Sequence, residues 1–389
     1  MNKTYRFRLK STKTQAEALL RQAGMSRFVF NWALDKKRGH YKETGETLAN
    51  KNLSAMLTSL KQEEGTKWLR EANAQSLQQS LRDLDRAFQN FFSKRSRFPK
   101  FKSRHKSPPS FRIPQRVRVQ DGKVYCPKIG WIRLRQSQEI VGKTKSATFK
   151  QDAQGHWYVT LVSEFDMPDA PLSDPKSCVG IDLGLEAFIA TSDGVKVAPL
   201  KLYRRSQAKL AREQRSLSRK QKGSNNRQKQ RRKVAKVHAK IRNQRQDFLH
   251  KLSTSLVAEY DLIAVEDLNI KGLAKSKLAK SILDAGWSEF IRQLEYKALW
   301  NRKHFVKIDR FYPSSKACSE CGAIQESMPL SVRKWVCDCG ATHDRDVNAA
   351  KNILRAGRMA VGQTVSACGA DVRQLDSVAV GSEARILPL

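Results

Sequence analysis

The chain has 389 residues, enough for two or three domains with separate cores, and its hydrophobic content of 40% is that of a folded protein. Lysine and arginine number 74 against 37 acidic residues, which gives a net charge of +37. A compact fold with this charge repels itself unless a polyanion compensates it, so a nucleic-acid partner is favoured over a ribosomal or membrane-surface one. No apolar run reaches the roughly 18–20 residues of a membrane span, so we expect no membrane partner and a cytoplasmic location.

The first part of the chain predicts a strand followed by a helical region. Tyr5, Phe7 and Leu9 alternate with basic residues, which is typical of a half-buried strand. Further on, apolar residues from Leu77 to Phe91 recur at helical spacing and give one helix an apolar face. Most polar faces opposite such a stripe are simply solvated, but glutamine and arginine can also read base edges. The candidate nucleic-acid contacts on this face are Gln75, Gln79, Arg82 and Arg86.

Residues 95–109 form a basic segment that contains Phe98 and Phe101. In an extended loop these rings could stack on bases while Lys100 and Lys102 contact phosphates. A surface loop anchored by the two rings is an equal alternative. Residues 117–164 then change to short alternating strands, which together with the N-terminal strand predict a small antiparallel barrel.

A proline-punctuated linker leads into an α/β pattern, which a basic segment at 201–251 interrupts. Glu213 and Asp247 are the acidic residues of this segment, and a turn that begins at Gly223 divides it into two predicted antiparallel helices. A charge run is usually a solvated face, but one so weakly neutralised favours a phosphate backbone as its partner. The candidate contacts are Arg204, Arg205, Arg231 and Arg232.

Four of the seven cysteines, Cys318, Cys321, Cys337 and Cys339, form a C-x2-C-x15-C-x-C pattern. Two thiolate pairs, each followed by a glycine, can close a tetrahedron around Zn²⁺. Disulfides are the alternative, which a cytoplasmic location disfavours. No further ligand competes for the ion, so the predicted site is structural rather than catalytic.

Three acidic residues far apart in the sequence belong to predicted buried elements. Asp182 lies in the apolar segment 178–185, Glu266 ends the strand at 262–266, and Asp346 opens a helix. Each alone could be a turn residue, a loop acid or a helix N-cap. Together they match the oxygen ligands of a hydrolytic site with two Mg²⁺ or Mn²⁺ ions, where one ion activates water and the other stabilises the leaving 3′ oxygen.

At these residues the sequence resembles the TnpB (OrfB-type) family encoded by insertion sequences, which is related to the type V CRISPR effectors. The resemblance extends from the strand at Tyr5 to the helix near Leu354. Its most specific motifs are Gly180-Ile181-Asp182-Leu183-Gly184, Val265-Glu266-Asp267-Leu268, Ser315-x-x-Cys318-x-x-Cys321-Gly322 and Asp344-Arg345-Asp346-Val347-Asn348-Ala349-Ala350.

The resemblance implies an α+β multidomain fold. It assigns residues 1–13 and 105–172 to a wedge β-barrel, 14–104 to a helical recognition lobe, and 173–315 with 341–356 to an RNase H-like (RuvC) α/β nuclease domain. The basic segment 201–251 would be a helical insertion, 316–340 a zinc-binding insert and 357–389 a flexible tail. By motif, the catalytic and Mg²⁺-binding acids are Asp182, Glu266 and Asp346, with Asp344 as the alternative to Asp346. Arg345 and Asn348 are expected to support the metal site or a substrate phosphate.

The resemblance also implies an RNA-guided DNA endonuclease of a prokaryotic mobile element, located at the nucleoid. A monomer on a guide RNA from the element end would cleave double-stranded DNA beside a short target-adjacent motif, using one RuvC site. Three alternatives stay open: a DNA-binding regulator that does not cleave, a DNA-joining transposase and a guide-free junction resolvase. The three retained acids disfavour the regulator, and Asp346 in place of a glutamate disfavours the transposase. A resolvase would need neither the recognition lobe nor the zinc insert.

Overall fold

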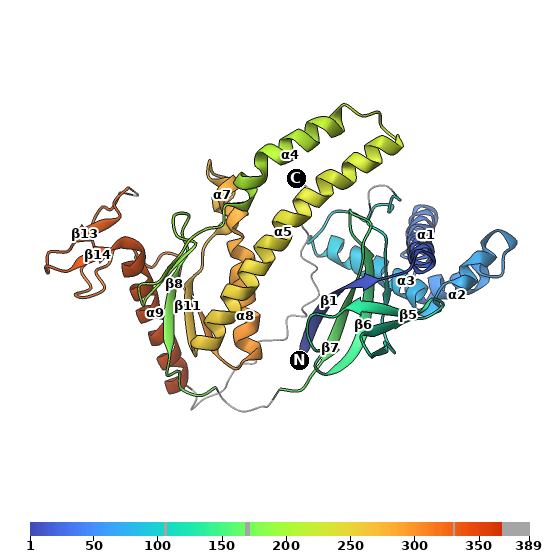
Figure 1. Ribbon diagram of the computed structural model, residues 1–389. Helices are drawn as coiled ribbons and strands as arrows, with labels where there is room; N and C mark the ends of the chain where they lie inside the picture. Colours follow the sequence, from blue (N-terminus) through green and yellow to red (C-terminus); the bar gives the residue numbers. More distant parts are fainter. Residues whose placement is uncertain (105–106, 168–171, 330, 368–389) are drawn as a thin grey trace. The chain divides into compact units, whose positions relative to one another are not determined.

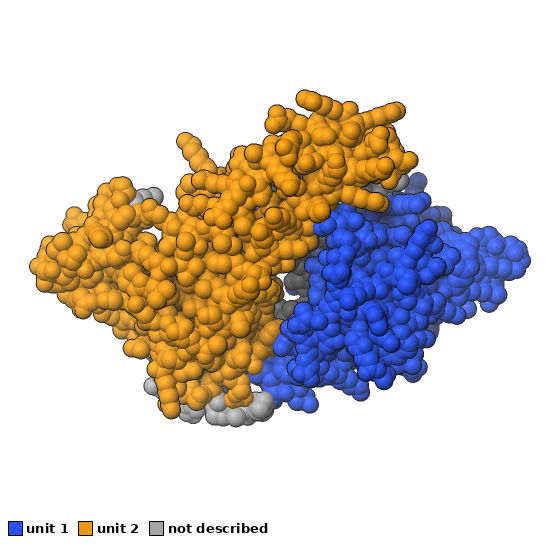
Figure 2. Space-filling view, viewed as in Figure 1, with its two compact units in different colours: residues 1–169 blue, residues 170–389 orange. Residues whose placement is uncertain are grey.

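The computed structural model describes residues 1–104, 107–167, 172–329 and 331–367. The chain divides into two compact units, residues 1–169 and 170–389 (Figure 2), and each is described by itself. No helix in the described ranges is long and apolar enough to cross a membrane.

A seven-stranded antiparallel sheet forms one half of the first unit, in the order β2-β6-β7-β1-β5-β4-β3. Its strands are β1 (Asn2–Lys10), β2 (Ser110–Ile113), β3 (Val119–Gln120), β4 (Lys123–Cys126), β5 (Gly130–Arg135), β6 (Lys143–Gln151) and β7 (Trp157–Glu164). The predicted N-terminal strand is present and pairs with both β5 and β7. The predicted closure of this sheet into a barrel is absent from the described residues, because the edge strands β2 and β3 do not pair with each other. A helix instead contributes Leu19 and Ala23 to the core of the sheet.

Helices form the other half of this unit. They are α1 (Lys13–Thr44), α2 (Asn50–Leu60), a 3₁₀ helix at Glu64–Glu71 and α3 (Ala74–Phe92). The predicted apolar face of α3 is present, because Leu77, Leu81 and Leu84 are fully buried against α1 and α2. The helix α1 begins at a capping box in which Thr12 and Gln15 bond reciprocally.

The second unit is built around a five-stranded sheet in the order β10-β9-β8-β11-β12. Its strands are β8 (Cys178–Asp182), β9 (Ile189–Thr191), β10 (Lys196–Val197), β11 (Leu262–Glu266) and β12 (His304–Ile308). The strands β8, β11 and β12 are parallel, whereas β9 and β10 run antiparallel to their neighbours.

Helices cover both faces of this sheet, as Figure 1 shows. Ile263 and Val265 of β11 pack towards α5 (Asn225–Glu259) and α8 (Trp287–Trp300). Between them, Ala264 packs on the other face with Ile353 of α9 (Arg345–Ala367). This alternation explains why the strand is apolar throughout: both of its faces are buried.

The remaining elements are α4 (Leu202–Ser218), α6 (Ile270–Leu273), α7 (Ala279–Ala285), β13 (Lys334–Val336) and β14 (Thr342–Asp344). The two predicted basic helices are α4 and α5, and α5 continues past residue 251 into the core. The expected flexible tail from residue 357 is wrong in its first part, because α9 continues to Ala367. A Cβ at Gly357 would stand 2.5 Å from the Cβ of Ala264, so this glycine permits close packing on β11 rather than ending the helix. Residues 368–389 lie outside the described residues.

Candidate active site and cysteine cluster

Asp182 and Glu266 lie at the same edge of the sheet. Each is the last residue of its strand, and β8 and β11 run parallel with Ile181 opposite Val265. Because the carboxyl ends of parallel strands meet at one edge, the two acids continue this register side by side. The apolar residues before them anchor the strands in the core and leave both carboxyl groups half-buried.

The helix that carries Asp346 lies unusually close to β8. A Cβ added to Gly180 would be 2.0 Å from the carbonyl oxygen of Ala350 and 2.6 Å from the nitrogen of Leu354. No other residue type fits there, because even alanine would collide with the helix backbone. This contact brings the first turn of α9 to the sheet edge that holds Asp182.

Asp344 and Asp346 have different environments. The Oδ1 of Asp344 accepts hydrogen bonds from the backbone N–H groups of Asp346 and Val347, both at 3.2 Å, so Asp344 caps helix α9. Asp346 lies in the first turn. Lys196 of β10 contacts both acids, with its Nζ 2.7 Å from Asp344 and 3.3 Å from Asp346. The capping role of Asp344 favours Asp346 as the third site acid.

The charges of the other two acids act on Asp182. Burial, followed by the negative charges of Asp346 and Glu266, raises the pKa of Asp182 to about 7. Burial also raises the pKa of Glu266, with Asp267 adding to the effect. A buried carboxyl group with a raised pKa beside other carboxylates is a common sign of a functional site.

This donor set suits divalent cations. Hard carboxylate oxygens are the ligands that Mg²⁺ and Mn²⁺ prefer, and a cation would offset both the burial and the repulsion that raise the pKa of Asp182. Lys196 already places a positive charge beside Asp346. Within the described ranges the acids are not gathered as tightly as the cysteines, which form the one group of three or more potential ligands within mutual reach.

The four predicted zinc ligands come together. The sulfur atoms of Cys318, Cys321, Cys337 and Cys339 all lie within 4.8 Å of one another. Burial raises the pKa of Cys318, but backbone N–H groups of residues 321 and 320 and the ring of His343, 3.0 Å from its sulfur, lower it to about 5. Conversely, burial and the neighbouring thiols outweigh a backbone hydrogen bond and raise the pKa of Cys337 to about 12. A thiolate cluster of this kind needs a cation to ionise fully, so it fits Zn²⁺.

Arg345 and Asn348, expected to support the metal site or a phosphate, contact the cysteine-bearing segment instead. The guanidinium of Arg345 donates to the carbonyl oxygen of Pro329 at 2.8 Å. The buried amide of Asn348 accepts from the N–H of Ser319 and donates to the carbonyl oxygen of Ala317. The positive charge of Arg345 also acts to lower the pKa of Asp182, so the expected support of the metal site by these two residues stays a prediction.

The candidate nucleic-acid contacts of the first unit fall into two groups. Arg82 and Arg86 are exposed on α3, whereas Gln75 is half-buried and Gln79 donates to Asp83 at 2.8 Å. In the basic segment Lys100 and Lys102 are exposed. Phe98 anchors this segment by packing edge-on against Phe88 and Phe91, and Asn31 bonds to both backbone groups of residue 102. Phe101, the second ring of the alternative interpretation, is 48% exposed.

The candidate contacts of the second unit are exposed along the paired basic helices. Arg204 and Arg205 lie on α4, and Arg231 and Arg232 lie on α5. The guanidinium of Arg204 donates to Ser281 at 3.3 Å. These helices pack on each other through Leu210 and Val237, which leaves their basic faces to solvent.

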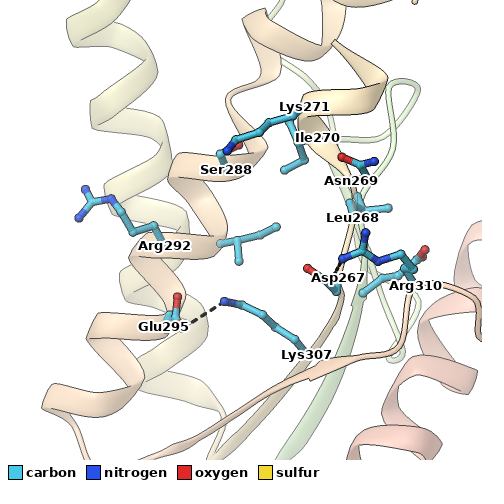
Figure 3. A pocket seen from close by; sticks show the side chains of 12 residues that line it. Asp267, Leu268, Asn269, Ile270, Lys271, Ser288, Arg292, Glu295, Lys307 and Arg310 are labelled. Atoms are coloured by element: carbon cyan, nitrogen blue, oxygen red, sulfur yellow. Dashed lines mark hydrogen bonds and ion pairs between the residues drawn. The ribbon is translucent and has the colours of Figure 1, made fainter. Parts of the chain in front are cut away.

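A hollow of about 440 Å³ lies beside Glu266, and no sequence pattern predicted it. It is lined by residues 266–271 and by side chains from α8 and from β12 with the turn after it (Figure 3). Lys196 and Gly180 were also missed as site residues. For Gly180, the one available signal was its position in an apolar strand two residues before Asp182.

Comparisons with known proteins agree with this architecture. A family model described as "Probable transposase" (OrfB_IS605) matches residues 160–277, a Cas12f1-like TNB domain matches 287–353, and an OrfB_IS605 helix-turn-helix domain matches 1–46. A "Putative RNA-guided DNA endonuclease" of Streptomyces pristinaespiralis is 42% identical over 378 residues, covering 96% of this chain and 92% of that protein. InsQ of Escherichia coli K12, named in the same way, is 37% identical over 384 residues, covering 94% and 93%.

Among solved structures, the chain is similar to the protein in the cryo-EM structure of the Cas12f1–sgRNA–target DNA complex. The TM-score is 0.55 over 88% of this chain and 83% of that one, at 16% sequence identity. At this identity the similarity establishes a shared fold and nothing further. With close relatives that match over nearly their whole length, the chain belongs to the OrfB (TnpB) family of insertion-sequence proteins.

Proposed function

We propose that this protein is an RNA-guided DNA endonuclease of an insertion sequence, which hydrolyses phosphodiester bonds at the edge formed by β8, β11 and α9. The observation that carries the proposal is the convergence of Asp182, Glu266 and Asp346, where burial and then the charges of the other two acids raise the pKa of Asp182 to about 7. The names of the two relatives above support the activity. The net charge of +37 supports nucleic-acid partners.

The strand order supports an RNase H-like (RuvC) domain. If the strands are numbered by their order in the chain, they lie side by side across the sheet in the order 3-2-1-4-5. Strands 1, 2 and 3 pair antiparallel in succession, and strands 4 and 5 run parallel to strand 1. In this proposal α4 and α5 are the basic insertion, the cysteine-bearing segment is the zinc insert, and the first unit provides the wedge sheet and the recognition helices.

The side chains around this edge have different roles in the proposed reaction. Asp182, Glu266 and Asp346 would hold two divalent ions, which when bound supply an activated water and stabilise the leaving 3′ oxygen. Asp344 holds the first turn of α9 in place, and Lys196 balances the charge of the acids. The exposed arginines of α3, α4 and α5 would contact the phosphates of the guide RNA and of the double-stranded target.

The test is to express the chain with its native flanking DNA and to sequence the RNA that co-purifies. The particle is then given Mg²⁺ and a matching duplex with randomised flanks. We expect cutting next to one enriched motif that depends on the RNA. Asp182→Ala should abolish cutting and preserve guide and target binding, whereas Asp247→Ala, on the exposed side of α5, should change neither.

The outcomes separate the alternatives. Bound RNA with tight target binding but no cutting would favour a regulator, and cutting without RNA would favour a resolvase-like enzyme. If Asp182→Ala lost target binding to the same degree as cutting, Asp182 would not be a metal ligand of the kind proposed.

A further inference from the structure

The hollow beside Glu266 has the composition of a site for one nucleotide. Leu268, Ile270 and Ile291 give it an apolar wall, and Lys271, Lys307 and Arg310 bring cationic side chains to it. In Figure 3 Lys271 reaches across the hollow towards Ser288, while Lys307 approaches from the opposite side. Apolar surface with a few convergent charged groups is typical of ligand sites, and the cations indicate an anionic ligand.

These cations are held in weak, exchangeable pairs. Lys307 bonds to Glu295 at 3.0 Å, and Arg310 pairs with Asp267, with all four side chains more than a third exposed. Within the described residues, no ion pair engages Lys271. Pairs as exposed as these contribute little to stability, so an incoming phosphate can replace the carboxylates.

A highly exposed aromatic ring, Phe311, follows directly in the chain. Phe311 is 85% exposed, the highest value of any large hydrophobic side chain in the described ranges. The next residue, Tyr312, packs against the core around Ile308. The turn is fixed, because Asp309 accepts a hydrogen bond from the N–H of Phe311 at 2.7 Å. Phe311 is therefore held out of the core by an ordered turn.

The position of this turn ties it to the acids. The strand β12 is parallel to β11, with Ile308 opposite Glu266. Residues 309–311 therefore leave the sheet at the carboxyl edge, where Asp182 and Glu266 also end their strands. A ring, a cationic hollow and the site acids thus share one edge.

We propose that Phe311 and this hollow form a subsite for an unpaired nucleotide of the DNA strand being cut, next to the scissile phosphate. The base stacks on Phe311, and Lys271, Lys307 and Arg310 contact the flanking phosphates. An unpaired strand is required, because in a duplex each base face is covered by its neighbours. This inference rests on the proposed function, since it takes the edge at Glu266 as the place of cleavage.

Photo-cross-linking locates the base without requiring cleavage. The full chain with its co-purified RNA is mixed, without added divalent ions, with an oligothymidylate that carries one 5-iodouracil, and cross-linked peptides are identified by mass spectrometry. We expect the cross-link on Phe311, its loss in Phe311→Ala and its return in Phe311→Tyr. Ile324→Ala, which truncates another exposed apolar side chain of the same unit, should leave it unchanged.

Cleavage kinetics provide the second measurement. Stacking contributes about 1–3 kcal/mol per base, so Phe311→Ala should raise KM for a single-stranded target about 5- to 150-fold. Its kcat should change little, and Phe311→Tyr should restore KM. Thermal melting checks that each variant is folded.

Two results would overturn the subsite: a DNA cross-link that Phe311→Ala does not remove, or a cross-link at Phe311 that forms with iodouracil in the guide RNA instead of in DNA. A Phe311 cross-link in a protein that never cleaves would uphold this DNA-binding site and reject the endonuclease. Cleavage with an unchanged KM in Phe311→Ala would uphold the endonuclease and reject this subsite.

Discussion

The side chain of Asn348 holds the peptide units on both sides of Cys318. Its Oδ1 accepts from the N–H of Ser319 at 2.9 Å, and its Nδ2 donates to the carbonyl oxygen of Ala317 at 2.7 Å. Asn348 lies two residues after Asp346 on the same helix and is almost fully buried. Asn348 therefore helps to fix the cysteine cluster to the helix that carries a site acid, together with Asn352, which also donates to the carbonyl oxygen of Ala317.

Replacing Asn348 should weaken both ends of this connection. Asn348→Ala leaves the buried N–H of Ser319 without its acceptor and removes one of the two amide donors to Ala317, which should cost about 1–3 kcal/mol of stability and speed the loss of zinc to a chelator. Asn348→Asp keeps the acceptor but loses the donor, so its effect should be intermediate. Zinc release followed with a colorimetric chelator tests this, with Asn226→Ala on the exposed part of α5 as the control. Zinc release at the wild-type rate in both Asn348 variants would contradict the coupling.

Removing one zinc ligand should unfold the local structure. Elemental analysis of the wild type should find one zinc ion per chain, and Cys318→Ser should find none. The melting temperature should fall, because zinc binding contributes directly to the folding of such small inserts. Cys178→Ser, which alters a half-buried cysteine outside the cluster, should retain the metal. A wild-type protein without zinc would refute the site.

Local patterns predicted the elements that carry the site. The apolar runs before Asp182 and Glu266 predicted their strands, and the structure places both acids at strand ends with Asp346 in the first turn of a helix. The four cysteines were predicted from spacing alone, because metal-ligand geometry restricts that spacing. Their sulfur atoms do come together.

Contacts between distant segments could not be predicted in the same way. Nothing near Gly180 in the sequence indicates that Ala350 will lie against it. Gly357 lies in the segment that was expected to be a flexible tail, but here its missing side chain permits packing of α9 on Ala264. The partners of Arg345 and Asn348 likewise depend on how the cysteine segment folds back on α9.

Gly180→Ala tests the close approach of α9 to β8. The added methyl group would stand 2.0 Å from the carbonyl oxygen of Ala350, so helix α9 must move outward. We expect a loss of stability of about 1–3 kcal/mol and a fall in cleavage rate, because Asp346 moves with the helix. The control is Gly39→Ala within α1, where nothing lies within 4 Å of the new Cβ and helix propensity should make the change slightly stabilising. Equal melting temperatures for Gly180→Ala and wild type would contradict the packing argument.

Lys196 competes with a divalent ion for the same acids. Its Nζ is 3.3 Å from Asp346 and also bonds to Asp344, so Lys196→Met should increase the affinity of the protein for Mn²⁺. The gain should be up to about fivefold, because partly exposed ion pairs contribute about 0–1 kcal/mol. Mn²⁺ binding measured by electron paramagnetic resonance checks this, with Lys251→Met as the control at an exposed pair. Unchanged affinity together with a loss of cleavage would instead assign Lys196 to a substrate phosphate.

The pKa of Asp182 predicts how the metal-free protein responds to pH. Its folded-state pKa of about 7 lies above the ordinary value of 3.8, because the group is buried beside Asp346 and Glu266. Between these two values the folded protein binds a proton that the unfolded chain has lost, so stability falls as pH rises from about 4 to about 7. The loss is at most about 4 kcal/mol, at 1.36 kcal/mol per pKa unit.

Asp182→Asn removes this titration and isolates its contribution. Without divalent ions, the melting temperature of wild type should fall relative to that of Asp182→Asn between pH 5 and pH 7. Above pH 7 the difference should level off, because the carboxyl group is then ionised in both states. Mg²⁺ should stabilise the wild type more at pH 8 than at pH 5.5, since the ion binds the ionised carboxylates, and should have a smaller effect on the variant. Parallel pH profiles for the two proteins would show that Asp182 titrates normally and that the three acids do not interact as proposed.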